Sequence, residues 1–433
     1  MQRSKACLTI LSLVLAINAL VGYRVFCNEA EKTGADEVFQ HIDTLMEVMQ
    51  LIRKNYVDID KVDYQELIRG AMEGMTNKLD PYSAFLPPKE FDSLMEDTEG
   101  EFGGIGVTIS VKDGILTVVS PIAGTPGAKA GIISGDQIIK IDQEPLENVV
   151  IDKAVARLRG KPGTSVSLTI YRPATEETID LTLERALIPL ISVADATVLN
   201  GTRIGHVRIT QFMEPTAGQL QKVLEDFVKK DVAAIIIDLR NNPGGLLDSA
   251  VDICSFFLPP GQLVVSVEGR EQKKVERSRE GGFKFPADKP VLLLINGGSA
   301  SAAEITAGCL SDTGRAILLG EKTFGKGSVQ NVVQLQDGSA LKLTIAKYYT
   351  PSRRVIHEHG IEPDIEDKLR PQDIIAIIKH EGDMDKLLDI DKQLKRAVDV
   401  LNSYLAFDSG KGSNFKKLRS QAAPEQSATP ATP

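Results

Sequence analysis

The segment between residues 290 and 310 carries a pattern that constrains the fold of the whole chain. Pro290 to Ile295 is a short apolar run of the kind that forms a buried strand. Gly297 and Gly298 follow, and a helical pattern of small and apolar residues then continues through Leu310. A buried strand that leads through a glycine turn into a helix is typical of an α/β fold.

Ser301 and Glu304 have the spacing of a capping box, which places Ser301 at the start of this helix. Free backbone N–H groups and the positive end of the helix dipole favour negative charge there, as on a reaction oxyanion. An isolated Ser-x-x-Glu is more often a plain helix cap. The residues alone leave both roles open, and they leave Ser299 as a competing nucleophile.

A nucleophilic serine needs a base. The chain has five histidines, and no sequence pattern connects any of them to the Ser301 segment. Lysine can serve when loss of solvent lowers its pKa. Lys326 lies between Gly325 and Gly327 in a segment short of charge, although a solvated loop lysine is the commoner interpretation of such a residue.

The sequence Gly-Ser-Ala-Ser-Ala-Ala-Glu-Ile, followed by Gly-Glu-Lys-Thr-Phe-Gly-Lys-Gly-Ser-Val-Gln, closely resembles the carboxy-terminal processing peptidases, also called tail-specific proteases. The resemblance implies that Ser301, rather than Ser299, is the nucleophile and that Lys326 is its base. It implies that Gln330 orients the lysine. It also implies that catalysis needs no cofactor and no metal.

Between residues 100 and 185 the pattern changes to short strands and glycine turns. Three ordered motifs, Gly-Gly-Ile-Gly-Val, Pro-Gly-Ala-Lys-Ala-Gly-Ile and Gly-Asp-Gln-Ile-Ile-Lys-Ile, resemble a PDZ domain. In such a domain an extended peptide joins a sheet edge. The resemblance places the carboxylate-binding loop at Gly104 to Gly106, with Ile105 and Val107 lining the side-chain pocket.

Arg159 stands directly before Gly160, at the expected end of the PDZ helix. In some family members an arginine at this place meets the catalytic glutamine when a tail is bound. The resemblance therefore makes Arg159 a candidate gate that acts on Gln330. A solvated surface arginine is an equal alternative.

Residues 187–366 alternate strands and helices, and the resemblance implies an α/β core of the crotonase type. A buried strand from Val232 to Leu239 leads into Arg-Asn-Asn-Pro-Gly-Gly, and such a turn presents backbone N–H donors. The segment resembles the family's Asp-Leu-Arg-x-Asn-x-Gly-Gly. It implies an oxyanion hole made by the N–H of Gly244, or of Gly245, together with that of Ala302.

Residues 1–30 are expected to be a signal peptide or a membrane anchor. Ala6 to Tyr23 carry no charge and follow Arg3 and Lys5. Because no small-x-small cleavage site follows, we favour a retained anchor with the amino terminus in the cytoplasm. The remainder would then be extracytoplasmic, either periplasmic and anchored in the inner membrane or exported.

Three further segments complete the expected organisation. Residues 36–98 form a helical region, which in this family can also carry contacts between copies of the chain. Residues 367–408 form a C-terminal helical segment, with one last helix from Asp385 to Phe407. Residues 409–433 are rich in Ser, Ala, Pro and Thr and are expected to be disordered. Arg353 departs from the family, which often has glycine there, so the local turn is in doubt.

Composition excludes other classes of function. The 433 residues suffice for two or three domains, and a net charge of −9 without a basic stripe argues against a nucleic-acid partner. The four cysteines show no metal-binding pattern. Cys254 and Cys309 lie in apolar helical patterns, which predicts buried thiols, although a disulfide between them stays open.

The sequence thus predicts a multidomain α/β serine endopeptidase. Its PDZ domain would capture unstructured, apolar carboxy-terminal tails of protein substrates, and a Ser–Lys dyad would cleave them. One alternative is an inactive PDZ-bearing scaffold that binds tails without cutting. The other is a nucleotide-binding protein, since residues 320–326 nearly match a P-loop; Gly327 replaces the Ser/Thr that this motif requires.

Overall fold

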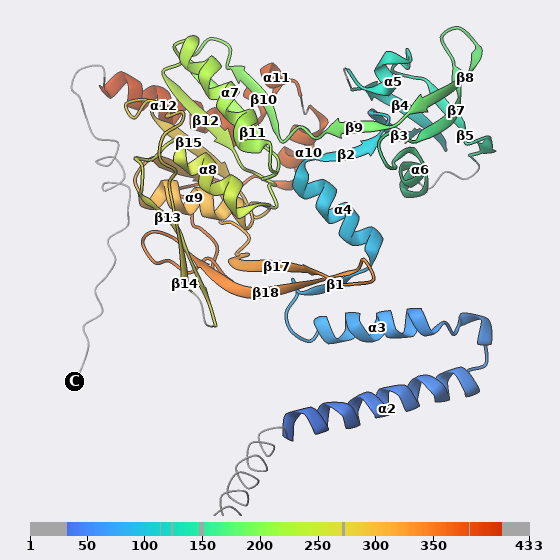
Figure 1. Ribbon diagram of the computed structural model, residues 1–433. Helices are drawn as coiled ribbons and strands as arrows, with labels where there is room; N and C mark the ends of the chain where they lie inside the picture. The colour runs from blue at the N-terminus through green and yellow to red at the C-terminus, as the bar shows by residue number, and fades with distance from the viewer. Residues whose placement is uncertain are drawn as a thin grey trace, which may run out of the picture. The chain divides into compact units, whose positions relative to one another are not determined.

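The computed structural model describes residues 33–112, 114–122, 124–146, 151–270, 273–380 and 382–408 (Figure 1). The expected anchor at 1–30 and the expected disordered tail at 409–433 lie outside these residues. The chain divides into two compact units, Met1–Phe85 and Leu86–Pro433. Each unit is described by itself.

The smaller unit is helical, as predicted. Its elements are α2 (Thr33–Asn55), the 3-10 turn η2 (Ile59–Lys61), α3 (Tyr64–Thr76) and the start of β1 (Ala84–Leu86). Asp63 caps α3, because its carboxylate accepts a 2.7 Å hydrogen bond from the N–H of Gln65. Along α2, apolar side chains such as Phe39 and Leu51 are exposed. No helix in the described parts of the chain is long and apolar enough to cross a membrane.

The larger unit begins with α4 (Pro88–Glu99) and continues into a β-rich domain with the predicted PDZ organisation. Its main sheet has the order β3-β4-β5-β7-β8, with β6 paired to β5. These strands are β3 (Val107–Lys112), β4 (Ile115–Pro121), β5 (Gln137–Ile141), β6 (Glu144–Pro145), β7 (Ser165–Arg172) and β8 (Glu177–Glu184). The helices are α5 (Pro126–Lys129) and α6 (Ile151–Leu158), and β2 (Glu101–Gly104) pairs with β9 (Ala186–Pro189). Fully buried Leu116, Ile141 and Ile170 form the centre of its core.

A six-stranded sheet with the order β10-β11-β12-β15-β16-β19 forms the centre of the predicted α/β core. Its strands are β10 (Val193–Val198), β11 (Ile204–Ile209), β12 (Ala234–Asp238), β15 (Val291–Ile295), β16 (Ala316–Gly320) and β19 (Ile365–Glu366). Only β10 runs antiparallel to its neighbour; the other strands are parallel. The predicted strand at 290–295 is confirmed, since every residue of β15 is buried.

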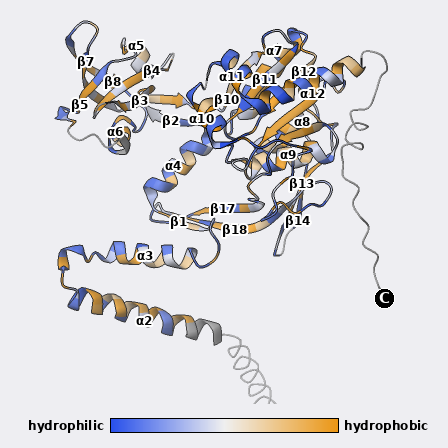
Figure 2. Ribbon diagram, turned by 180° about the vertical axis from the view of Figure 1, so that it is seen from behind, coloured by the Kyte–Doolittle hydropathy of each residue, from blue (hydrophilic) through white to orange (hydrophobic). Residues whose placement is uncertain are grey.

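Both faces of this sheet are covered, which explains why its central strands β12, β15 and β16 are almost entirely apolar (Figure 2). One face packs against α7 (Thr216–Lys229), α8 (Leu247–Ser255) and α9 (Ala302–Asp312). The other packs against α11 (Met384–Ile390) and α12 (Lys392–Asp408), while α10 (Pro371–Lys379) precedes them. Neighbouring residues of one strand point to opposite faces of the sheet. Ile235 lies in the first core, with α7, α8 and α9, and Ile236 lies in the second core, with α11 and α12.

An antiparallel sheet packs beside the first core. Its strands in the larger unit are β13 (Leu263–Gly269), β14 (Lys273–Arg277), β17 (Ser328–Gln334) and β18 (Ala340–Tyr349). The long β18 pairs with both β13 and β17. Tyr348 and Ala346 of β18 belong to the core formed with α8 and α9.

The prediction of one last helix from Asp385 to Phe407 is wrong, because the helix is interrupted at Asp391, between α11 and α12. Asp391 has an extended backbone (φ −83°, ψ 100°) at the break. One of its carboxylate oxygens accepts the N–H of Leu394, and the other pairs with Arg240 at 2.7 Å. The carboxylate thus caps α12 and ties it to the central sheet, which outweighs helix continuity.

Two smaller expectations are resolved by the fold. Cys254 and Cys309 are free thiols and both are fully buried. Arg353 adopts a left-handed backbone (φ 67°) at the position where the family often has glycine. Its side chain pairs with Glu268 at 2.6 Å and lies over the ring of Tyr349, contacts that a glycine could not make.

The central sheet should carry much of the stability of the larger unit. Leu294 is fully buried beneath α12, so Leu294→Ala should lower the free energy of unfolding by about 2–5 kcal/mol. The matched control is Leu187→Ala on β9, where the side chain is 54% exposed and the cost should stay within about 0.5 kcal/mol. Denaturant unfolding of the full chain measures both. Equal costs would contradict this account of the core.

Candidate active site

Ser301 is the N-cap of α9, as its spacing from Glu304 predicted. It follows the carboxyl end of β15 and is 8% exposed. Its backbone lies at φ 52°, ψ −113°, a region that non-glycine residues rarely occupy. The Glu304 carboxylate accepts the N–H of Ser301 at 2.8 Å.

Ser299, the competing nucleophile, has a structural role. It is fully buried, and its hydroxyl donates to the backbone oxygen of Leu239 at 2.8 Å. The same hydroxyl accepts the N–H of Asn296 at 3.0 Å. The first hydrogen bond joins the turn after β15 to Leu239, directly after β12, and the second closes the turn itself, so Ser299 holds the turn together.

Lys326 lies in the loop between β16 and β17 and is half-buried. Its backbone N–H donates to Glu304 Oε2 at 2.9 Å. This is the oxygen that accepts the N–H of Ser301, so the two backbone nitrogens lie within two hydrogen-bond lengths of each other. A strand, β17, follows the loop, whereas a P-loop needs a helix there; the nucleotide-binding alternative is therefore not supported.

The pKa of Lys326 is lowered. Burial is the largest cause, and the positive charge of Lys342 on β18 lowers it further. The negative charge of Glu304 acts in the opposite direction. A lysine with a lowered pKa is more often neutral, which is the form that can accept a proton.

The loop after β12 brings the two predicted oxyanion glycines against the serine. Gly244 (φ 97°) packs so closely that a Cβ there would lie 2.7 Å from Ser301 Cβ and 2.6 Å from the Ala300 oxygen. Gly245 (φ 137°) leaves no room either, since its Cβ would lie 2.0 Å from the Phe212 oxygen. Both positions thus require glycine.

Asn242, which sequence reasoning passed over, decides which N–H groups of this loop are available. Its buried side chain accepts the Gly244 N–H at 2.8 Å and donates to the Ile209 oxygen at 2.7 Å. The N–H groups of Gly245 and Ala302, in contrast, have no acceptor among the residues that the structure describes. The asparagine in the Asp-Leu-Arg-x-Asn motif was the only sequence signal for this role.

Gln330 lies on β17, four residues beyond Lys326. Its amide nitrogen donates to the hydroxyls of Ser328 at 3.0 Å and Thr344 at 3.1 Å. These contacts fix the side chain on the sheet that carries the lysine loop.

Arg159 does not meet Gln330 in this structure. Its guanidinium pairs with Glu96 of α4 at 3.0 Å and lies 4.4 Å from the centre of the Phe102 ring. The side chain is therefore about one-third exposed but engaged, neither a free surface arginine nor a partner of the glutamine.

The predicted carboxylate loop of the PDZ domain is held from behind. The Ile105 oxygen accepts the Gly127 N–H at 2.7 Å, and Gly106 (φ 71°) turns against Thr125. Ile105 itself is 2% exposed and belongs to the domain core, while Val107 packs at its margin. In the described part of the chain, the N–H groups of Ile105 and Gly106 meet no acceptor.

One histidine lies closer to the lysine loop than the sequence suggested. The backbone nitrogen of His357 would be 2.1 Å from a Cβ on Gly327, so the two segments are packed directly together. Glu358 donates its N–H to the Gly325 oxygen at 2.8 Å. The His357 Nδ1 is buried without a hydrogen-bond partner in the described residues.

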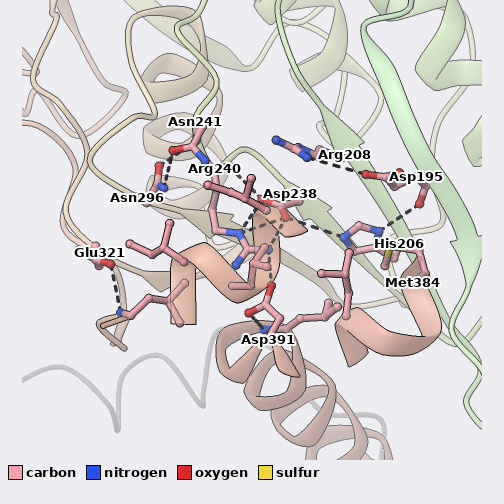
Figure 3. A pocket seen from close by; sticks show the side chains of 16 residues that line it. Asp195, His206, Arg208, Asp238, Arg240, Asn241, Asn296, Glu321, Met384 and Asp391 are labelled. Carbon is pink, nitrogen blue, oxygen red and sulfur yellow. Dashed lines mark hydrogen bonds and ion pairs between the residues drawn. The ribbon is translucent and has the colours of Figure 1, made fainter. Parts of the chain in front are cut away.

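A cavity of about 370 Å³ lies at the opposite, α11–α12 side of the sheet (Figure 3). Arg240, from the loop after β12, forms its polar floor: it pairs with Asp238 at 2.6 Å and with Asp391 at 2.7 Å. Burial opposes ionisation of Asp238, yet the Arg240 charge holds the pKa of that carboxyl below its usual range. The network anchors the loop that continues to Gly244.

Comparisons with known proteins identify the family of the chain. Residues 203–367 match the family model described as peptidase family S41, residues 103–183 match the PDZ domain, and residues 23–89 match the N-terminal domain of the activating protease CtpB. A solved photosystem II D1 C-terminal processing protease aligns at 27% identity and a TM-score of 0.43, over 76% of this chain and 92% of that one.

Curated relatives are more similar in sequence. A carboxy-terminal-processing protease of Bartonella bacilliformis is 40% identical over 345 residues, which cover 79% of this chain and 78% of the relative. The carboxy-terminal processing protease CtpB of Bacillus subtilis is 34% identical over 376 residues, 86% of this chain and 77% of the relative. These matches confirm the resemblance stated from the motifs, with its helical region, PDZ domain and protease core. The chain belongs to peptidase family S41, as a carboxy-terminal processing serine protease that carries a PDZ domain.

Proposed function

We propose that this protease cleaves polypeptides with a Ser301–Lys326 dyad and selects them by an unstructured, apolar carboxy-terminal tail. The convergence of three loops supports the proposal most directly. The nucleophile, the lysine and the glycine pair come from different segments, yet Ser301 contacts Gly244 and shares a carboxylate oxygen with Lys326. An inactive scaffold would not require this arrangement.

The proposed reaction begins with neutral Lys326, which accepts the hydroxyl proton as Ser301 Oγ attacks the peptide carbonyl. The N–H of Ala302 and a glycine N–H of the β12 loop stabilise the oxyanion. Gly245 is the better placed glycine, because the Gly244 N–H is already bound by Asn242. The Lys326 ammonium then protonates the leaving amine, and water releases the acyl-enzyme.

Recognition of the tail is assigned to the PDZ domain. The N–H groups of Ile105 and Gly106 would hold the terminal carboxylate, and Val107 on β3 would contact the last side chains. Because Ile105 is buried, it supports the pocket from within the core. The apolar pocket wall favours apolar tails.

The setting of the enzyme is part of the proposal. Residues 1–30 would anchor it in the membrane, with the protease on the extracytoplasmic side, because their uncharged run follows two basic residues. The apolar side chains exposed on α2 support self-association. Fractionation of cells, followed by protease accessibility, tests the location, and full protection from external protease after outer-membrane permeabilisation would contradict it.

The dyad is tested by single substitutions. Ser301→Ala and Lys326→Ala should each lower kcat by on the order of 10⁴-fold, because nucleophile and base act as a unit, while tail binding should stay unchanged. Cleavage of an unfolded protein with an apolar tail, followed by mass spectrometry, measures kcat. Substantial activity in Ser301→Ala would disprove the assignment.

His357 calls for a control in this experiment, because it packs beside the lysine loop. His357→Gln should retain most of the activity. If Lys326→Ala keeps activity and the Lys326→Ala, His357→Gln double variant loses it, then the histidine is the base. Ser299→Ala serves as a second control: it should destabilise the turn without the loss seen for Ser301→Ala.

The pH dependence follows from the charges around Lys326. Since only the neutral amine accepts a proton, kcat/KM should rise with pH through the lowered pKa of Lys326. Lys342 lowers that pKa, so Lys342→Gln should raise it and move the rising limb to higher pH. Activity at neutral pH should fall, and alkaline pH should restore it. An unmoved limb would show that Lys342 has no such effect.

The gate is tested by Arg159→Ala. If a bound tail brings Arg159 from Glu96 to Gln330, the substitution should lower kcat much more than it weakens tail binding. Glu96→Gln is the matched control, because it removes the resting partner and should not lower kcat. Normal turnover in Arg159→Ala would reject the gate and leave the dyad chemistry untouched.

A further inference from the structure

The Glu304 carboxylate occupies an unusual position in the site. The residue is fully buried, and neutral groups hydrogen-bond to its carboxylate. Burying a charge without a cation is costly unless hydrogen bonds replace the lost water. Four donors do so here, three backbone N–H groups and one hydroxyl.

The two oxygens of the carboxylate divide these donors between them. Oε2 accepts the N–H groups of Ser301 at 2.8 Å and of Lys326 at 2.9 Å. Oε1 accepts the N–H of Gly325 at 2.7 Å and the hydroxyl of Thr323 at 2.5 Å. A single side chain on the first turn of α9 therefore fixes both the residue that begins the helix and the loop that carries the lysine.

The hydrogen-bond directions indicate that Glu304 is ionised. Thr323 Oγ1 accepts the N–H of Ile361 at 2.7 Å, so its own proton is free to point at the carboxylate. With three N–H groups also directed at the two oxygens, a carboxyl proton would face a donor on every side. Burial raises the pKa of Glu304, and these four hydrogen bonds oppose that rise.

We propose that Glu304 is a positioning residue of the protease, one that sets the distance between the nucleophile and its base through their backbone N–H groups. The proposal rests on the Ser301–Lys326 chemistry and adds to it a third group that touches neither substrate nor reacting atoms. Thr323 is its support, because this hydroxyl joins the carboxylate to the segment after β18 through Ile361.

The arrangement has an electrostatic consequence. An ionised Glu304 favours the ammonium form of Lys326, whereas burial and Lys342 favour the neutral amine. The charge of Glu304 thus opposes the proton transfer that its hydrogen bonds make possible. Loss of the charge should lower the pKa of Lys326, whereas loss of the hydrogen-bond geometry should lower kcat. A residue that served only as a helix cap would affect stability but would change neither kcat nor the pKa of Lys326.

Glu304→Gln separates the two effects. Its amide oxygen can still accept two N–H groups, but its NH₂ group cannot accept from Gly325. We expect kcat to fall roughly 10²-fold, as for displaced reacting groups, with KM and tail binding within twofold. The rising limb of the pH profile should move to lower pH. Unchanged kcat with an unmoved limb would overturn the proposal.

A second pair of variants tests the proposal even if Glu304→Gln fails to fold. Thr323→Ser keeps the hydroxyl and should keep kcat, whereas Thr323→Val removes the hydrogen bond to Oε1 and should lower kcat at unchanged KM. Circular dichroism and melting temperature establish that both are folded. Equal kcat in Thr323→Ser and Thr323→Val would reject the positioning role of Glu304.

Failure of the proposed function would look different. If Ser301→Ala or Lys326→Ala stays active, then the dyad is wrong whatever Glu304 does. If both dyad variants are inactive while the Glu304 and Thr323 variants show native kcat and pH profile, then only the positioning role falls.

Discussion

The parallel arrangement of the central sheet is the constraint on which the site depends. Parallel strands end at the same edge, so the loops after β12, β15 and β16 all emerge there. Those three loops carry the glycine pair, Ser301 and Lys326. Because both faces of the sheet are packed, the strand ends cannot shift independently, and residues far apart in sequence are held in one place.

The hydrophobic pattern and the glycine and proline turns sufficed to predict the strands at the centre of the sheet. The strands predicted at 232–239 and 290–295 stood out because parallel strands covered on both faces are almost entirely apolar. The boundary between the C-terminal helices was harder to predict. Residues 385–407 keep a helical pattern across Asp391, and what breaks the helix is an ion pair with Arg240, a contact 151 positions away that no local pattern contains.

Ser301 and Lys326, the proposed reacting residues, were found from motifs, whereas the residues that hold them in place were not. Glu304 was recognised only as a helix cap, since its bonds to Gly325 and Lys326 depend on a loop that returns from the next strand. Asn242 binds the Gly244 N–H two residues along the chain, but its second hydrogen bond, to the Ile209 oxygen, comes from a distant strand that no local pattern contains. Buried polar groups acquire their partners through the tertiary fold, and a sequence shows the groups without the partners.

The backbone of Ser301 shows how these supports act together. Its positive φ is unfavourable for a residue with a Cβ, and such a conformation persists only where the surroundings over-determine it. Glu304 binds the N–H of Ser301, and Ile305 donates to its carbonyl oxygen, so both sides of the residue are fixed. Gly244 fits against Ser301 because it lacks a Cβ. The same contacts that maintain the strained serine therefore bring the lysine loop and the glycine loop to it, so that placement of the proposed nucleophile and assembly of the candidate site depend on the same residues.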